Sequence, residues 1–86
     1  MAWRVEFEKR AKRELDALGS DTRERIVKAL HRLAADPRNA ANVKALHGGS
    51  YRLRVGDYRV IYALDENVLI VLVVKIGHRR DVYRRA

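Results

Sequence analysis

The sequence has no cysteine among its 86 residues. Disulfide bonds, thiol nucleophiles and zinc sites built on thiolates are therefore excluded. The three histidines, His31, His47 and His78, lie too far apart along the chain to form a local metal-binding motif. The sequence gives no reason to expect a metal ion or any other cofactor.

Long apolar runs are also missing. The longest, residues 68–74, spans seven residues, whereas a membrane-spanning helix needs about 20. The first residues, Met-Ala-Trp-Arg-Val-Glu, show no signal-peptide pattern. The sequence also contains no glycine-rich phosphate loop, Ser-His-Asp triad or paired glycosidase carboxylates. We therefore expect a cytoplasmic protein that makes no contact with a membrane.

Positive charge, by contrast, is in excess. Nineteen Lys and Arg against eleven Asp and Glu give a net charge of +8 and a pI of about 10.4. Residues 1–43 carry a net +3 and residues 44–86 a net +5, and seven of the nine basic residues in the second part are arginines. The planar guanidinium group pairs with two phosphate oxygens at once. This composition favours a protein that binds a polyanion, although a merely soluble basic surface would have the same charge.

The first half of the chain has the pattern of one strand and two helices. We expect a single domain over residues 1–86, because this length supports one core. Residues 3–7 alternate apolar and polar side chains, as a half-buried strand does. Apolar residues then recur at helical spacing up to Gly19, and again from Ser20 until Pro37 ends the helix. The short connection predicts an antiparallel helical hairpin.

The second half has the pattern of β-strands. Residues 38–50 show no periodicity and predict a loop. Strand patterns follow at residues 51–55, 58–64 and 68–76, and Gly77 is expected to end the last of them. That last strand is apolar on both faces, which predicts a place inside the sheet. The predicted fold is α+β in the order β-α-α-β-β-β, with a helical hairpin packed on a mostly antiparallel four-stranded sheet.

The turn at Gly56-Asp57 predicts how the two flanking strands pair. A two-residue hairpin loop fixes their register, which places Arg54 directly opposite Arg59, with Arg52 on the same face. Like charges directly opposite each other destabilise a sheet, so we expect this cluster to bind an anion. The alternative is that the long side chains diverge into solvent.

A second basic cluster follows the last strand, with the sequence Gly-His-Arg-Arg-Asp-Val-Tyr at residues 77–83. We expect the chain to bend at Gly77 and to bring Arg79 and Tyr83 toward the first cluster. A tyrosine beside arginines can stack on an unpaired RNA base, or its hydroxyl can be drawn toward ionisation. The same tyrosine could instead cap the core. His78 is a candidate for proton transfer, because the pKa of histidine lies near neutrality.

These two stretches resemble those of the RelE/ParE toxin superfamily. Tyr-Arg-Leu-Arg-Val-Gly-Asp-Tyr-Arg-Val-Ile-Tyr at residues 51–62 and Ile-Gly-His-Arg-Arg-Asp-Val-Tyr at residues 76–83 look like the signature segments of RelE-type toxins. The order of elements and the basic pI also match. The resemblance implies an mRNA interferase, a metal-independent endoribonuclease that enters the decoding site of the ribosome and cuts messenger RNA. It also implies a cognate antitoxin protein that wraps and inhibits the toxin.

The resemblance also implies which residues form the site. Catalytic roles fall on Arg54, Arg59, Arg79 and Tyr83, with Tyr83 as the base. Contacts with RNA fall on Arg52 and Arg54, and we add Lys44, His78 and Arg80. The best-known relatives carry lysines where this chain has Arg52 and Arg54. Arginine keeps the positive charge but does not give up a proton.

Two alternatives stay open beside the nuclease. One is a ParE-like toxin that poisons DNA gyrase, and the other is a basic RNA-binding domain without catalysis. ParE-like toxins generally lack the set Arg59, Arg79 and Tyr83, so its presence favours the nuclease. We expect the antitoxin segment to be acidic and apolar, and to lie across the helices near the arginine cluster, because the chain is strongly basic.

Overall fold

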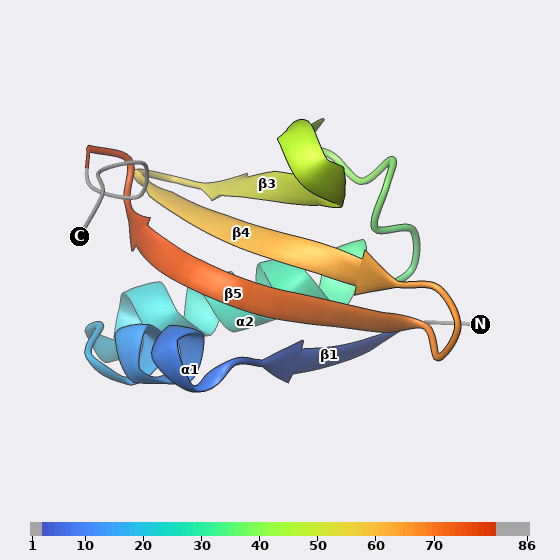
Figure 1. Ribbon diagram of the computed structural model, residues 1–86. Helices are drawn as coiled ribbons and strands as arrows, with labels where there is room; N and C mark the ends of the chain where they lie inside the picture. Colours follow the sequence, from blue (N-terminus) through green and yellow to red (C-terminus); the bar gives the residue numbers. More distant parts are fainter. Residues whose placement is uncertain (1–2, 81–86) are drawn as a thin grey trace.

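The structure is a computed structural model that describes residues 3–80. Two α-helices lie on one side of a five-stranded sheet (Figure 1). The elements are β1 (Arg4–Phe7), α1 (Lys9–Asp16), α2 (Ser20–Leu33), β2 (Val43–Ala45), a 3-10 turn at His47–Gly49, β3 (Ser50–Val55), β4 (Tyr58–Asp65) and β5 (Ile70–His78). The predicted α+β class, with two helices packed on a sheet, is confirmed. Neither helix within residues 3–80 has the length and apolar character needed to cross a membrane.

The sheet has one strand more than the four predicted. Its order is β1-β5-β4-β3-β2, with β1 parallel to β5 and every other neighbouring pair antiparallel. The extra strand is β2, which pairs with β3 from Val43 opposite Leu53 to Ala45 opposite Tyr51. The prediction of a loop over residues 38–50 was wrong here, because three residues are too few to show a period of two.

β5 runs further than the sequence predicted. It ends at His78, and Gly77 lies inside it, opposite Arg59 of β4. The prediction that Gly77 ends the strand was therefore wrong. Pairing with β4 on one side keeps the chain extended through the glycine, whose intrinsic preference for strands is low. β5 lies between β1 and β4, so it is an inner strand, as its apolar sequence indicated.

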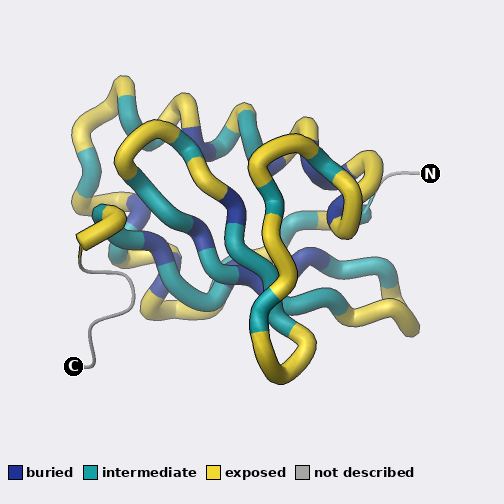
Figure 2. The backbone as a smooth tube through the Cα atoms, turned by 90° about the horizontal axis from the view of Figure 1, so that it is seen from above, coloured by how far each residue is buried: buried dark blue, intermediate teal, exposed yellow. Residues whose placement is uncertain are grey.

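The core lies between the helices and the sheet. Each helix contributes one apolar stripe, and alternate residues of the three long strands are buried against it. Figure 2 shows the buried segments of the chain alternating with less buried ones. The buried cluster consists of Ala11, Leu15, Ile26, Leu30, Leu33, Leu53, Val60, Tyr62, Val71, Val73 and Ile76. Since these residues bury one face of the sheet, the residues between them in the strands are turned to the other face.

Tyr62 ties the sheet to the segment after α2. Its side chain is fully buried, and its hydroxyl donates a hydrogen bond to the carbonyl oxygen of Pro37 at 2.6 Å. Its ring stacks on that of Tyr51 with the centroids 5.5 Å apart. Burial, followed by the charge of Tyr51, raises the pKa of the Tyr62 hydroxyl well above its ordinary value. The hydroxyl therefore stays protonated and keeps donating.

We expect Tyr62→Phe to lower the free energy of unfolding by about 1–3 kcal/mol, because it leaves the buried Pro37 carbonyl without its donor. The pKa of Tyr62 is higher in the folded than in the unfolded chain. Above pH of about 10 the unfolded chain therefore loses this proton first, and wild-type stability falls as the pH rises. Urea unfolding from pH 8 to 11 should show a shallower fall for Tyr62→Phe. Equal slopes for the variant and the wild type would contradict the assignment.

Candidate nucleic-acid interface

The face of the sheet away from the helices carries a cluster of positive charge. One row across the sheet runs from Lys44 of β2 to Arg52, Ile61 and Lys75. A second row runs from Arg54 to Arg59 and Gly77. Paired residues lie on the same face, and the rows alternate with buried residues of the core. We call the five cations Lys44, Arg52, Arg54, Arg59 and Lys75 the cationic face.

The predicted opposition of Arg54 and Arg59 is present in the register. Their guanidinium groups turn in different directions. Arg54 Nη2 lies 3.5 Å from Asn42 Oδ1, whereas Arg59 Nη1 donates to the carbonyl oxygens of Gly56 and Tyr58, at 3.1 Å each. These acceptors are neutral, so they satisfy donors without compensating charge. The two side chains thus diverge, and the positive charge of each remains available to a bound anion.

Lys75 belongs to the cationic face, although it was not among the residues predicted from the sequence. It sits in an otherwise apolar strand, where the pattern predicted burial on both faces. An irregularity in β5 between its partners Ile61 and Tyr62 turns Lys75 to the open face. The burial of Val73 and Ile76, three positions apart instead of two, marks the break in the alternation, and only the structure shows it.

Arg79 joins Arg59 at one end of the sheet. The backbone N–H of Arg79 donates to the Asp57 carbonyl oxygen at 2.7 Å, and its Nε lies 3.9 Å from Asp57 Oδ1. Asp57 and Gly56 form the turn between β3 and β4, to which Arg59 also bonds. The structure thus brings Arg59 and Arg79, two of the residues for which the resemblance implies a catalytic role, to the same turn. Both Arg79 and Asp57 are largely exposed, so their ion pair is easily exchanged for a ligand.

His78 does not join the cationic face. It pairs with Tyr58, which has the same orientation as the buried Val60, on the helix side of the sheet. Its ring meets the Tyr58 ring edge-on at 5.7 Å, and its Nδ1 accepts a hydrogen bond from the Arg80 N–H at 3.2 Å. The alternation of β5 thus turns His78 to the face opposite the arginines, and its contact with RNA stays a prediction. Tyr83 lies outside the described residues.

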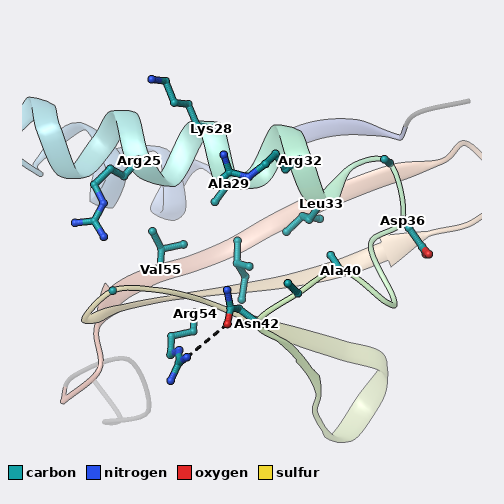
Figure 3. Close-up of a pocket in the computed structure, with 14 residues that line it drawn as sticks. Arg25, Lys28, Ala29, Arg32, Leu33, Asp36, Ala40, Asn42, Arg54 and Val55 are labelled. Atoms are coloured by element: carbon teal, nitrogen blue, oxygen red, sulfur yellow. Dashed lines mark hydrogen bonds between the residues drawn. The ribbon is translucent and has the colours of Figure 1, made fainter.

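A groove of about 590 Å³ lies between α2 and residues 53–56 at the end of β3 (Figure 3). Its apolar lining includes Ala29, Leu33, Leu53 and Val55. Its charged lining consists of Arg25, Lys28, Arg32 and Arg54, with Asp36 as the acidic member. Figure 3 shows Arg25 extending from the helix toward the sheet. The groove was not predicted from the sequence, although the spacing of the three α2 cations by three and four residues places them on one side of a helix.

Comparison with known proteins identifies the family. The model of the family described as "ParE toxin of type II toxin-antitoxin system, parDE" matches residues 5–83. The chain belongs to the ParE/RelE toxin family. The resemblance carried by the two sequence stretches is therefore confirmed.

Individual relatives point to the RelE side of this family. The chain is 33% identical over 90 residues to "mRNA interferase toxin RelE" of Escherichia coli K12, covering 100% of this chain and 95% of that protein. It is 30% identical over 87 residues to "Toxin RelG" of Mycobacterium tuberculosis, covering 99% and 100%. Among solved structures, the toxin in the intact E. coli RelBE toxin-antitoxin complex matches with a TM-score of 0.76 and 33% identity, over 90% of this chain and 96% of that chain.

The cationic face predicts how this toxin responds to salt. Every phosphate of a single-stranded RNA that a protein cation neutralises adds about 0.7 to the slope of log K against log[salt]. We expect Arg54→Gln and Lys75→Gln each to reduce the slope by that amount, measured by fluorescence titration of labelled RNA. Lys12→Gln is the control, because Lys12 lies on α1 and pairs with Asp16. A slope that changes as much in the control as in the two variants would contradict this assignment.

Proposed function

We propose that this chain is a toxin that cleaves messenger RNA at the ribosome. The observation that carries the proposal is the cationic face, together with Arg59 and Arg79 held at one turn of the sheet. An open face of this kind can lie along a phosphate backbone. The identity with the E. coli mRNA interferase supports the same reaction for this chain.

The proposed reaction is an attack of the RNA 2′-hydroxyl on the adjacent phosphorus. The 2′-oxygen forms a new bond to phosphorus while the bond to the 5′-oxygen breaks, which leaves a 2′,3′-cyclic phosphate and a 5′-hydroxyl end. Tyr83 accepts the proton of the 2′-hydroxyl in its ionised, phenolate form, and the 5′-oxygen takes up a proton from water. The hydroxide that this leaves removes the proton from Tyr83 and regenerates the phenolate. Arg59 and Arg79 stabilise the negative charge that builds on the phosphate oxygens.

The remaining cations hold the RNA strand. Arg52, Arg54, Lys44 and Lys75 form the rest of the cationic face, and they bind the phosphates that flank the cleaved bond. Arginine at positions 52 and 54 stabilises charge but does not release a proton. This chemistry therefore relies on orientation and charge neutralisation, which can supply most of the acceleration in such a reaction.

The matching family model is named for ParE toxins, which favours a second candidate, the ParE-like toxin that poisons DNA gyrase. Such a toxin would need the same fold without the nuclease set. The two candidates differ in a direct measurement. Purified protein is incubated with ribosomes carrying a defined message, and separately with gyrase and supercoiled DNA. The nuclease produces new message ends only when ribosomes are present, whereas the gyrase poison leaves the message whole and accumulates cut DNA.

We expect Arg59→Ala and Arg79→Ala each to reduce the rate of message cleavage by about 100- to 1000-fold, because each removes one donor to the transition-state charge. Arg79 pairs with exposed Asp57 and Arg59 donates to the backbone carbonyls of Gly56 and Tyr58, so stability should change by under about 0.5 kcal/mol. Arg13→Ala, on the last turn of α1, is the matched control and should cut normally. Wild-type rates in both variants would overturn these roles.

We further propose that the groove between α2 and β3 receives the antitoxin. Its apolar lining suits the apolar side of a helix or strand, and Arg25, Lys28 and Arg32 suit acidic side chains beside it. The groove also reaches Arg54 of the cationic face. An antitoxin segment seated there would continue onto the RNA-binding face and block it. A complex of a relative with its antitoxin, the E. coli RelBE complex, supports such a partner.

Reversing the charge of the groove should separate the cleavage of message from the binding of the antitoxin. We expect the double variant Lys28→Glu, Arg32→Glu to cut message at the wild-type rate but to associate with the antitoxin at least about tenfold more slowly, because steering by opposite charge is reversed. The control Lys9→Glu, Arg13→Glu makes the same change of net charge on α1. Stopped-flow association at several salt concentrations measures the difference. Equal slowing in both double variants would mean that net charge alone steers the partner.

A further inference from the structure

β5 contains one residue more than the stretch of β4 that it pairs with. Ile61 pairs with Lys75, but the next residue of β4, Tyr62, pairs with Val73. Val74 is therefore the extra residue of a β-bulge. The bulge lies in the strand that leads to Arg79.

The bulge decides which side chains reach the cationic face. Val71 and Val73 are fully buried, and the next buried residue of the strand is Ile76. If the alternation continued unbroken from Val73, Lys75 would point into the core and Ile76 would point to solvent. A buried lysine ammonium group without a partner is costly. The bulge reverses the alternation once, so Lys75 joins the row of Lys44 and Arg52.

Pairing with β1 stops where the bulge begins. The last paired residues of the two strands are Phe7 and Val73, and the N–H of Glu8 donates to the Val73 carbonyl oxygen at 2.9 Å. Beyond this point α1 replaces β1 beside β5. The N–H of Ile76 donates to Glu14 Oε1 of α1 at 2.7 Å.

Glu14 is well placed for this contact. The next residue, Leu15, is buried in the core, which fixes the rotation of α1 about its axis. The second carboxylate oxygen, Oε2, accepts a hydrogen bond from Arg10 Nε at 3.3 Å. The Glu14 side chain is 28% exposed, so its bond to the Ile76 N–H is partly shielded from water. A carboxylate acceptor makes a stronger bond to a backbone N–H than a neutral acceptor does.

We infer that Glu14 is a positioning residue, which holds the β-bulge of β5 in the register that places Lys75 on the cationic face and Arg79 at the Asp57 turn. It does not touch the RNA. It acts through the Ile76 N–H, one residue after Lys75 and three before Arg79. The effect on cleavage rests on the proposed function, whereas the effect on the strand does not.

Three substitutions separate the acceptor from the charge. Glu14→Asp keeps the charge but shortens the side chain by one methylene, so the carboxylate no longer reaches the Ile76 N–H. Glu14→Gln loses the charge but keeps an acceptor oxygen at full length. Asp16→Ala is the control, because Asp16 is the other carboxylate of α1 that pairs with a cation, Lys12, on the helix surface.

Amide exchange by NMR tests the strand without reference to function. We expect Glu14→Asp to lower the protection of the Ile76 N–H by at least about tenfold, as removal of one charge-assisted hydrogen bond does. The cross-strand contact of Lys75 with Ile61 should weaken, while that of Leu72 with Ala63, before the bulge, should persist. Glu14→Gln and Asp16→Ala should retain most of the protection and both contacts.

RNA binding and cleavage test the consequence. In Glu14→Asp we expect weaker binding of single-stranded RNA, with a salt slope reduced by about 0.7 for the displaced Lys75, together with slower cleavage. In Glu14→Gln we expect RNA binding and the cleavage rate to stay close to those of the wild type. Wild-type Ile76 protection in Glu14→Asp, or equal impairment in Glu14→Gln and Glu14→Asp, would overturn the inference. If the wild-type protein cuts no message while Glu14→Asp still alters Ile76 protection and RNA binding, the proposed function is overturned and the positioning role stands.

Discussion

The burial of a single face of the sheet under α1 and α2 is the constraint on which the rest of this structure depends. Apolar residues of the long strands face the helices, and Tyr62 fastens the sheet to the Pro37 carbonyl within that core. Since side chains alternate along a strand, burial of one set commits the other set to the open face. The positions of Arg52, Arg54 and Arg59 therefore follow from the packing of hydrophobic residues on the opposite side of the sheet.

The same constraint places two requirements on β5. It must fill the core beneath both helices and also carry positive charge onto the open face. A uniform alternation cannot do both over the sequence around Val73 and Ile76, and one β-bulge resolves the conflict. Past the bulge, the backbone N–H of Ile76 lies beyond the end of β1. It donates a hydrogen bond to the carboxylate of Glu14 on α1 instead. One hydrogen bond thus connects the packing of α1 with the cationic face.

The cationic face gathers positive charges on one side of the sheet. Arg54 and Arg59 lie opposite each other and bond to neutral oxygens of Asn42, Gly56 and Tyr58. Like charges directly opposite each other in a sheet cost free energy. An anion that binds the folded and not the unfolded chain recovers this free energy. The same logic applies to RNA and to an acidic antitoxin segment, so binding of one should exclude binding of the other wherever they share Arg54.

The sequence by itself determined the two helices, the three long strands and the opposition of Arg54 and Arg59, because periodicity and a two-residue turn are local signals. It also supported membership of the toxin family, because each of the two signature segments, at residues 51–62 and 76–83, is one unbroken stretch of sequence. Tertiary structure decided what depends on pairing between distant segments. β2 forms by pairing with β3. His78 faces the helices because side chains alternate along β5, and Lys75 reaches the open face because of the β-bulge. None of these is visible in a local pattern, because each is fixed by the strand or helix that packs alongside.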